Sequence, residues 1–414
     1  MKTALLCLGV VLCAGGPAAA QRVRDSAGIR IVESSQPAVA ANRMWRLAPQ
    51  PVLQIGSTDG DSVYEFLRIM GVTRLRDGRI AVANQGTNTI RFFDAQGKYL
   101  SAFGRSGEGP GEFLQILNFR VFAGDSFAVA DVNRVNYYSA QGEYARTIAF
   151  VAPPRPRIYV MAFLTDGSYL GLPSRPGSRT EPQGGRWVDS VTLMRVGPGP
   201  SMLDTLGRFP GTLVSYGASA RSPMPVVFGP RFRLAVGAET HYVGFPERYE
   251  ILAVSSSGAL KQIIRRSGAR RETPSAAIAQ HREWMINRPG EDGRPAPPEM
   301  REYWSKLARE TEFSAELPAY SALLVDRTGH LWVRQYDPEE EMYRPGPISV
   351  RTFAKALPWD VFDPGGAWLG RIELPANFTP LEIGADYLAG VWRDADEVEY
   401  VRFYRLIKPE SDRP

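Results

Sequence analysis

Cysteine is almost absent from this 414-residue sequence, whose only two cysteines, Cys7 and Cys13, lie within the first 20 residues. A chain without that segment forms no disulfide, has no thiol nucleophile and offers zinc no cysteine ligand. Histidine is also scarce. The three histidines, His241, His281 and His330, are far apart in the sequence and lack the paired spacing typical of a metal site. No Gly-x-Ser-x-Gly motif is present, which disfavours serine hydrolases of that type. After the first 20 residues, no apolar run approaches the ~18 residues of a membrane-spanning helix.

The N-terminus has the pattern of a secretory signal. Lys2 gives a positive start, residues 5–13 are apolar, and three alanines precede Gln21. We therefore expect a signal peptide over residues 1–20 and a secreted or periplasmic protein. An uncleaved membrane anchor and lipid attachment at Cys13 are the alternatives, although Leu12 is large for the residue before a lipidated cysteine.

Composition favours a globular protein with short strands. The chain is 44% hydrophobic, and its 40 glycines and 33 prolines are spread along its length. The net charge of +5 is small for this length, and the basic residues form no evident run. We therefore expect no nucleic-acid partner.

A repeat runs along the chain. Residues 54–66 resemble residues 102–113, with Gly56 matching Gly104 and Glu65-Phe66 matching Glu112-Phe113. A strand, a tight turn with Asp or Gly, and a second strand follow, as in residues 75–83, 163–170 and 325–333. A second hairpin is clearest in residues 90–100 and 135–144. Each repeat therefore predicts four antiparallel strands.

The second strand of each unit is apolar on both faces. Residues 80–83 and 127–130 are the clearest examples. A sheet with one face in water would alternate polar and apolar residues, so these sheets are predicted to pack between two neighbours. Repeated four-stranded sheets that pack face to face around an axis form a propeller.

The sequence accommodates six such units. Their predicted strand regions are 69–103, 116–149, 158–209, 230–266, 319–374 and 378–407. The last unit supplies three strands, and we expect residues 45–55 to complete it and close the ring. The predicted fold is an all-β, six-bladed β-propeller over residues 44–407, with an N-terminal extension at 21–43 and a C-terminal tail at 408–414.

Three segments within residues 77–113 have the sequence pattern of a known type of repeat. Residues 77–84, 90–97 and 107–113 resemble NHL-repeat six-bladed β-propellers, especially their exported bacterial members. The resemblance is specific over residues 54–149 and weaker afterwards. It implies a ring with a ligand-facing top. It implies no single chemistry, because such propellers and their relatives include binding modules, lactonases and amide lyases.

Insertions lengthen three of the units beyond the ~45 residues of a typical propeller blade. They lie at residues 174–186, 335–357 and 270–317. The last is predicted to form a helical hairpin between the fourth and fifth blades, with Thr273 capping a helix over 276–287 and a second helix over 299–310. We expect it on the same end of the ring as the loops that follow each second strand. It acts there either as a cap over the rim or as a lid over the central mouth.

Polar residues follow the second strands and are expected around the top mouth of the central channel. Converging groups of both signs can bind a polar ligand, although Asn and Asp also occur in turns without one. The expected ligand-binding residues are Asn84, Asp131, Asn133, Glu247, Arg334, Asp337 and Arg393. Asn88, Arg175, Arg248, Tyr336 and Asp394 belong to the same loops.

We expect the protein to bind a peptide, glycan or protein partner at its top face, as a monomer with no cofactor and no metal. The alternative is a metal-dependent lactonase or esterase, for which Asn84, Asp131 and Glu247 could supply oxygen ligands. The early Glu of the lactonases' ligand set has no clear counterpart here, and without paired histidines a zinc-dependent amide lyase is disfavoured. The glycine-rich loop at 107–111 superficially resembles a phosphate cradle, but Pro110 removes one donor and a strand follows, which favours a structural turn.

Overall fold

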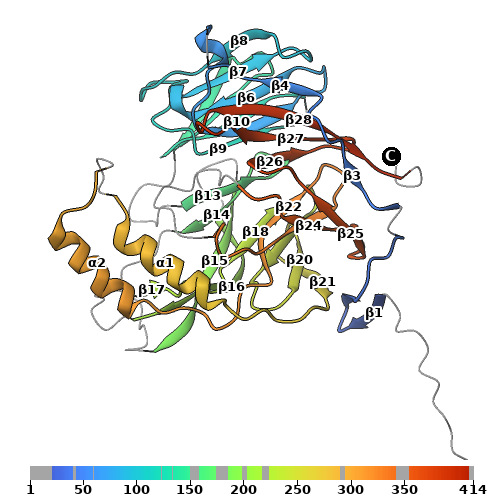
Figure 1. The fold of residues 1–414 in the computed structure, drawn as a ribbon. Helices are drawn as coiled ribbons and strands as arrows, with labels where there is room; N and C mark the ends of the chain where they lie inside the picture. Colours follow the sequence, from blue (N-terminus) through green and yellow to red (C-terminus); the bar gives the residue numbers. More distant parts are fainter. Residues whose placement is uncertain are drawn as a thin grey trace, which may run out of the picture.

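The structure is a computed structural model that describes residues 21–40, 43–58, 60–122, 124–132, 134–149, 158–173, 185–197, 203–216, 223–289, 294–341 and 354–409. Within these residues, the strands form six sheets; five are built on four consecutive antiparallel strands, and the sixth on three consecutive strands joined by N-terminal strands. These sheets are the blades of a β-propeller, so the predicted fold class is confirmed (Figure 1).

The first three blades follow the predicted units. Blade 1 contains β5 (Ile69–Arg74), β6 (Ile80–Asn84), β7 (Thr89–Phe93) and β8 (Tyr99–Phe103). Blade 2 contains β9 (Asn118–Val121), β10 (Phe127–Ala130), β11 (Arg134–Tyr138) and β12 (Tyr144–Ala149). Blade 3 contains β13 (Ile158–Phe163), β14 (Tyr169–Pro173), β15 (Arg186–Val196) and β16 (Leu203–Ser215), with β17 (Met224–Pro225) at its edge.

The remaining blades complete the ring. Blade 4 contains β18 (Arg233–Val236), β19 (Thr240–Gly244), β20 (Glu250–Ser255) and β21 (Leu260–Arg266). Blade 5 contains β22 (Tyr320–Val325), β23 (Leu331–Gln335), β24 (Pro358–Phe362) and β25 (Trp368–Glu373). Blade 6 contains β26 (Phe378–Ile383), β27 (Tyr387–Arg393) and β28 (Glu399–Ile407), joined by β3 (Arg46–Leu47) and β4 (Leu53–Ile55).

Six hydrophobic clusters hold the blades together, one between each pair of neighbours around the ring. The second strands contribute to two clusters each. On β6, Ile80 and Val82 pack toward blade 6, whereas Ala81 and Ala83 pack toward blade 2. This double burial is the physical reason for the apolar character of both faces in the sequence, and it requires a closed stack of sheets.

An N-terminal segment closes the ring, as predicted. Residues Leu53–Ile55 of β4 pair with β28, and Arg46–Leu47 of β3 pair with its last two residues. The predicted strand over 45–55 is divided into these two pieces. Pro49 and Pro51 lie between them, and proline has no N–H to donate to the partner strand.

The N-terminal extension contains a hairpin that sequence analysis did not anticipate. Strands β1 (Gln21–Ser26) and β2 (Ile29–Ser34) are joined by Ala27 and Gly28, both with positive φ, as a tight two-residue turn requires. Strand β2 pairs in parallel with β21, so blade 4 becomes a six-stranded sheet.

The helical insertion contains α1 (Ser275–Asn287) and α2 (Pro298–Glu310), close to the predicted ranges. The predicted cap is wrong, because Pro274 occupies the capping position and the buried hydroxyl of Thr273 has no hydrogen-bond partner. The segment after α2 joins the connection that follows blade 3, where the Val227 N–H donates to Glu312 O at 2.9 Å. In Figure 1, both helices lie on the other side of the molecule from β1.

The loops after the second strands and the connections between blades share one end of the ring, which we call the top face. The insertion lies at this face, because α1 residue Ala277 packs with Phe228 and with Tyr336, which follows β23. None of the helices in the described part of the chain has the length and apolar character needed to cross a bilayer.

Candidate functional site

Asn84, the last residue of β6, and Asp131, the residue after β10, occupy equivalent positions of the repeat in blades 1 and 2. Each is 1% exposed. Asn84 Oδ1 accepts the N–H of Leu67 at 2.9 Å, and Asp131 Oδ2 accepts the N–H of Leu114 at 3.0 Å. Leu67 and Leu114 are themselves equivalent positions in the connections that enter the two blades. The two side chains therefore join each second strand to the connection beside it, and they present almost no surface to a ligand.

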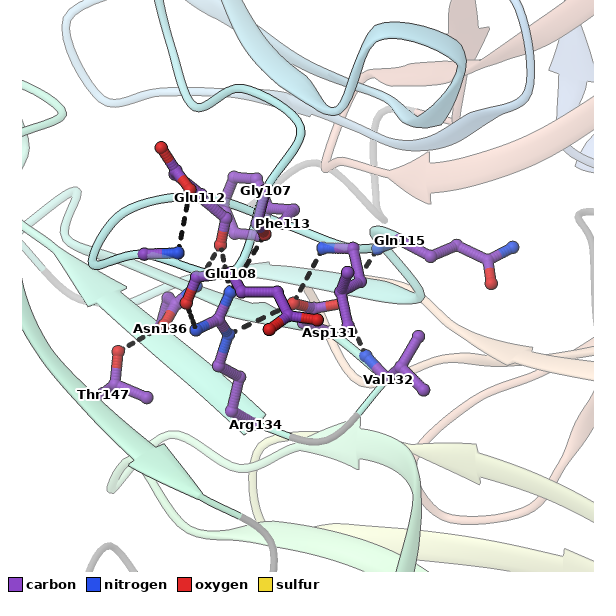
Figure 2. Close-up of polar contacts among 12 residues, drawn as sticks. Gly107, Glu108, Glu112, Phe113, Gln115, Asp131, Val132, Arg134, Asn136 and Thr147 are labelled. Atoms are coloured by element: carbon purple, nitrogen blue, oxygen red, sulfur yellow. Dashed lines mark hydrogen bonds and ion pairs between the residues drawn. The ribbon is translucent and has the colours of Figure 1, made fainter.

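The connection at residues 107–113 is held in the same way, as Figure 2 shows. Arg134 donates to the main-chain oxygens of Gly107 at 3.2 Å and Glu112 at 2.9 Å, and its Nε lies 3.2 Å from Asp131 Oδ2. The N–H of Gly109 donates to the Glu112 carboxylate, and this bond is the main cause of a lowered pKa for Glu112. The glycine-rich loop therefore directs its polar groups at the protein and forms a structural turn.

Arg334 is enclosed by acidic side chains from its own loop. It is 1% exposed, and its guanidinium lies 3.3 Å from Glu340 Oε2 and 3.9 Å from Glu341 Oε1. Asp337 accepts the N–H of Glu339 at 3.0 Å and pairs with Lys355 at 3.1 Å. The described part of this loop is thus organised around a buried ion pair.

The other expected mouth residues differ in exposure. Glu247 and Arg248 are exposed, whereas Arg393 is partly buried and pairs with Glu399. Asn88 is buried and accepts the N–H of Ile116 at 3.2 Å. Asp394 accepts main-chain N–H groups within its own turn, and Tyr336 packs against the helical insertion. Asn133 and Arg175 lie outside the described residues.

Two of the three oxygen ligands considered for a metal are already engaged by the protein. Asn84 and Asp131 are bound to main-chain amides, and Glu247 lies on the loop after β19. Within the described ranges, no three His, Cys, Asp or Glu side chains are placed to hold a metal ion. His241 and His330 lie at the start of second strands, away from the top face. His241 is fully buried, and this burial lowers its pKa.

A groove of about 1030 Å³ lies at the top face between blades 4 and 5, and of the residues expected from the sequence at the mouth, Glu247 and Arg248 line it. Its lining comes from the end of β2, the loop between β19 and β20, both ends of the helical insertion, and β24 and β25. Six arginines and four carboxylates line it, an excess of two positive charges. The arginines are Arg248, Arg265, Arg266, Arg270, Arg271 and Arg371, and the carboxylates are Glu33, Glu247, Glu250 and Asp360.

Asp360 organises the floor of this groove. It is 5% exposed and lies 3.3 Å from the Arg266 guanidinium and 3.0 Å from Arg371 Nε, and it accepts the Tyr249 hydroxyl at 2.8 Å. The Arg266 guanidinium lies over the Tyr249 ring at 4.5 Å and the Trp368 ring at 4.8 Å. Burial, reinforced by the Asp360 charge, raises the pKa of Tyr249. These contacts fix Arg266 in place before any ligand arrives.

The remaining arginines differ in how fully they are neutralised. Arg265 pairs with Glu250 at 2.7 Å and Glu33 at 2.9 Å, and these bonds raise its pKa. Arg271 donates to the main-chain oxygen of Tyr336 at 2.8 Å and has no acidic side chain within ion-pair distance among the described residues. Arg270 pairs with Glu316 at 2.8 Å, whereas Arg248 is exposed and makes no ion pair with any described residue. The groove therefore keeps cationic groups that its own carboxylates do not neutralise.

A local signal for this site was present in the sequence. Residues 265–271 read Arg-Arg-Ser-Gly-Ala-Arg-Arg, so the expectation that basic residues form no run is wrong for this segment. The run connects β21 to the helical insertion, and its four arginines all line the groove. Arg248 was expected at the top face from its place after the second strand of blade 4, whereas the contribution of Arg371 had no signal in the sequence, because only the fold brings it to the same place.

Comparison with known proteins agrees with the fold. A family model described as "6-bladed beta-propeller" matches residues 65–159. The sheets and this match define the protein as a six-bladed β-propeller; the narrower NHL assignment stays a prediction. No curated protein matches the sequence.

Solved structures of similar fold include a member of the DUF4221 family from Bacteroides vulgatus. It is 11% identical, with 89% of this chain and 99% of that chain covered at a TM-score of 0.51. A candidate exported protein from Bacteroides fragilis is 13% identical, with 91% of this chain and 100% of that chain covered at a TM-score of 0.46. A gluconolactonase from Xanthomonas campestris is 12% identical, with 88% of this chain and 100% of that chain covered at a TM-score of 0.39. At such identities the likeness concerns the fold alone.

Proposed function

We propose that this protein is an exported binding module that captures an anionic ligand in the groove between blades 4 and 5. The observation that carries the proposal is the excess of arginines over carboxylates in a groove of about 1030 Å³. This volume lies at the upper end of the range typical of ligand sites. Arg248 and Arg271 make no ion pair with a described residue, and such guanidinium groups attract anions and orient carboxylate or similar groups through paired N–H donors.

The rigidity of the groove supports this role. Asp360 holds Arg266 and Arg371, and the two acids Glu33 and Glu250 hold Arg265. Guanidinium groups that are fixed in advance lose little conformational freedom on binding, so more of the interaction energy appears as affinity.

The central mouth is a weaker candidate for a ligand site, and so is a lactonase-like reaction there. Asn84, Asp131 and Arg334 are each 1% exposed and are bound to protein groups. The proposal therefore keeps the expected binding role at the top face but moves it from the mouth of the channel to the groove between two blades.

The test is binding of fluorescently labelled polyglutamate, followed by anisotropy, to the wild type and to the double variant Arg248→Gln/Arg371→Gln. Arg248 is exposed, and Asp360 keeps Arg266 and Tyr249 as partners when Arg371 is replaced. We expect the double variant to bind about tenfold more weakly or worse, and the wild type to lose affinity as salt is raised.

Arg76→Gln/Arg146→Gln is the matched control. Both arginines are exposed, Arg76 between β5 and β6 of blade 1 and Arg146 on β12 of blade 2, so their replacement also removes two positive charges away from the groove. Equal affinity of the wild type and the double variant, or an equal loss in the control, would overturn the proposal.

A further inference from the structure

The wall of the groove contains a short stretch of main chain without hydrogen-bond partners. Ser267 donates its N–H to Ser34 O at 2.9 Å, and Arg271 O accepts the N–H of Leu317 at 2.8 Å. Between these two residues, the N–H and C=O groups of Gly268, Ala269 and Arg270 form no hydrogen bond with any described residue. All three residues are exposed and line the groove.

This stretch continues a paired segment. Thr273 donates its N–H to Ala315 O at 2.9 Å, and Glu272 and Glu316 form an antiparallel bridge. The pairing ends because the chain diverges beyond Leu317, where Ala319 donates instead to Pro246 O. Residues 268–270 therefore offer a free edge of main chain, a feature to which an extended peptide can add as a strand.

We infer that the ligand is an acidic peptide, bound in an extended conformation with its main chain paired to residues 268–270 and its carboxylates directed at the arginines of the groove. The inference rests on the proposed function and names the ligand class for the same site. Alternate side chains of an extended peptide point the same way, so acidic residues at every second position face one wall. Arg248 and Arg371 are exposed on that surface, and Arg270 is 54% exposed although it pairs with Glu316 at 2.8 Å.

The groove favours a peptide over an acidic polysaccharide. A polysaccharide has no regular series of amide donors and carbonyl acceptors to satisfy the free main chain of residues 268–270. The aromatic rings of Tyr249 and Trp368 are covered by the Arg266 guanidinium, and Trp368 is only 7% exposed, so they offer no open face to a sugar ring.

The experiment compares three labelled probes with the full-length protein. The first is an octapeptide of alternating Glu and Thr, blocked at both ends, and the second is the same peptide with N-methyl groups on alternate amides along one edge. The third is polygalacturonate. N-methylation removes amide donors and keeps every charge, so we expect it to weaken binding about tenfold or more.

A protein variant tests the same contact from the other side. Ala269→Pro removes one N–H from the free edge, whereas Ala269→Ser keeps it, and residue 269 is exposed in both cases. We expect only the proline variant to lose affinity for the unmethylated peptide, with the melting temperature of each variant measured alongside.

The outcomes separate the two proposals. Equal binding of both peptides would overturn strand pairing and leave anion capture standing. Tighter binding of polygalacturonate than of the peptide would identify an acidic glycan as the ligand and overturn the peptide inference. No binding of any anionic probe would overturn the proposed function itself.

Discussion

Replacing Asp131, one of the expected ligand contacts, by alanine is expected to destabilise the protein strongly. Its carboxylate accepts N–H groups from Leu114 at 3.0 Å, Gln115 at 2.9 Å and Val132 at 2.6 Å, and it pairs with Arg134 at 3.2 Å. Alanine leaves three main-chain donors without their acceptor and Arg134 without its counter-ion. Removing one partner of a buried charged network costs about 3–5 kcal/mol, and we expect a loss in the free energy of unfolding within that range.

The assay is urea unfolding at pH 7, followed by fluorescence and circular dichroism. Asp131→Asn keeps the shape of the side chain but replaces one acceptor oxygen by a donor, so we expect a smaller loss of about 2 kcal/mol. The control is Asp386→Ala, because the Asp386 side chain is 74% exposed and pairs with Arg74 at the surface at 3.3 Å, a contact worth less than about 1 kcal/mol. If Asp131→Ala unfolds within about 1 kcal/mol of the wild type, the structural role of Asp131 is refuted.

Three further predictions concern stability. Gly104→Ala should cost about 2 kcal/mol or more in urea unfolding, because φ is +89° and a Cβ would lie 2.5 Å from the Phe113 ring; a neutral result would contradict this packing. Arg334→Ala should lower the unfolding free energy by about 3–5 kcal/mol, since it leaves buried Glu340 uncompensated; a folded, equally stable variant would show that the ion pair is dispensable. Burial lowers the pKa of His281 to about 4, so the unfolded chain takes up the proton first as pH falls below 6.5. The stability from neutral His281 is then complete above pH 6.5 and falls by up to about 3 kcal/mol toward pH 4. His281→Leu should remove this part of the slope, and equal slopes in both proteins would reject it.

The fold was predictable because its signals are local and repeated. The double-sided apolar pattern of β6 and β10 requires sheets on both sides, and the six interblade clusters meet that requirement. The strand that closes the ring was predictable because blade 6 lacked one strand. The β1–β2 hairpin was not, since its parallel pairing with β21 joins segments more than 200 residues apart and leaves no local mark.

The candidate site was less predictable, because similar residues serve two purposes. The repeat correctly located Asn84 and Asp131 beside the connections between blades, but the pattern is the same whether such residues meet a ligand or a main-chain amide. Only burial distinguishes the two cases. The groove depends on Arg248, Arg371 and residues 265–271, which come from two blades and an insertion, and their proximity is a property of the assembled ring.

Amide hydrogen exchange, measured with and without bound polyglutamate, tests the location of the site most directly. We predict slower exchange in peptides that cover residues 247–250 and 267–271, where the ligand contacts the arginines. We predict unchanged exchange around residues 85–88 and 114–116, whose polar groups hold the blade connections. Protection confined to the second pair of segments, with none at the groove, would place the ligand at the central mouth and contradict the proposal.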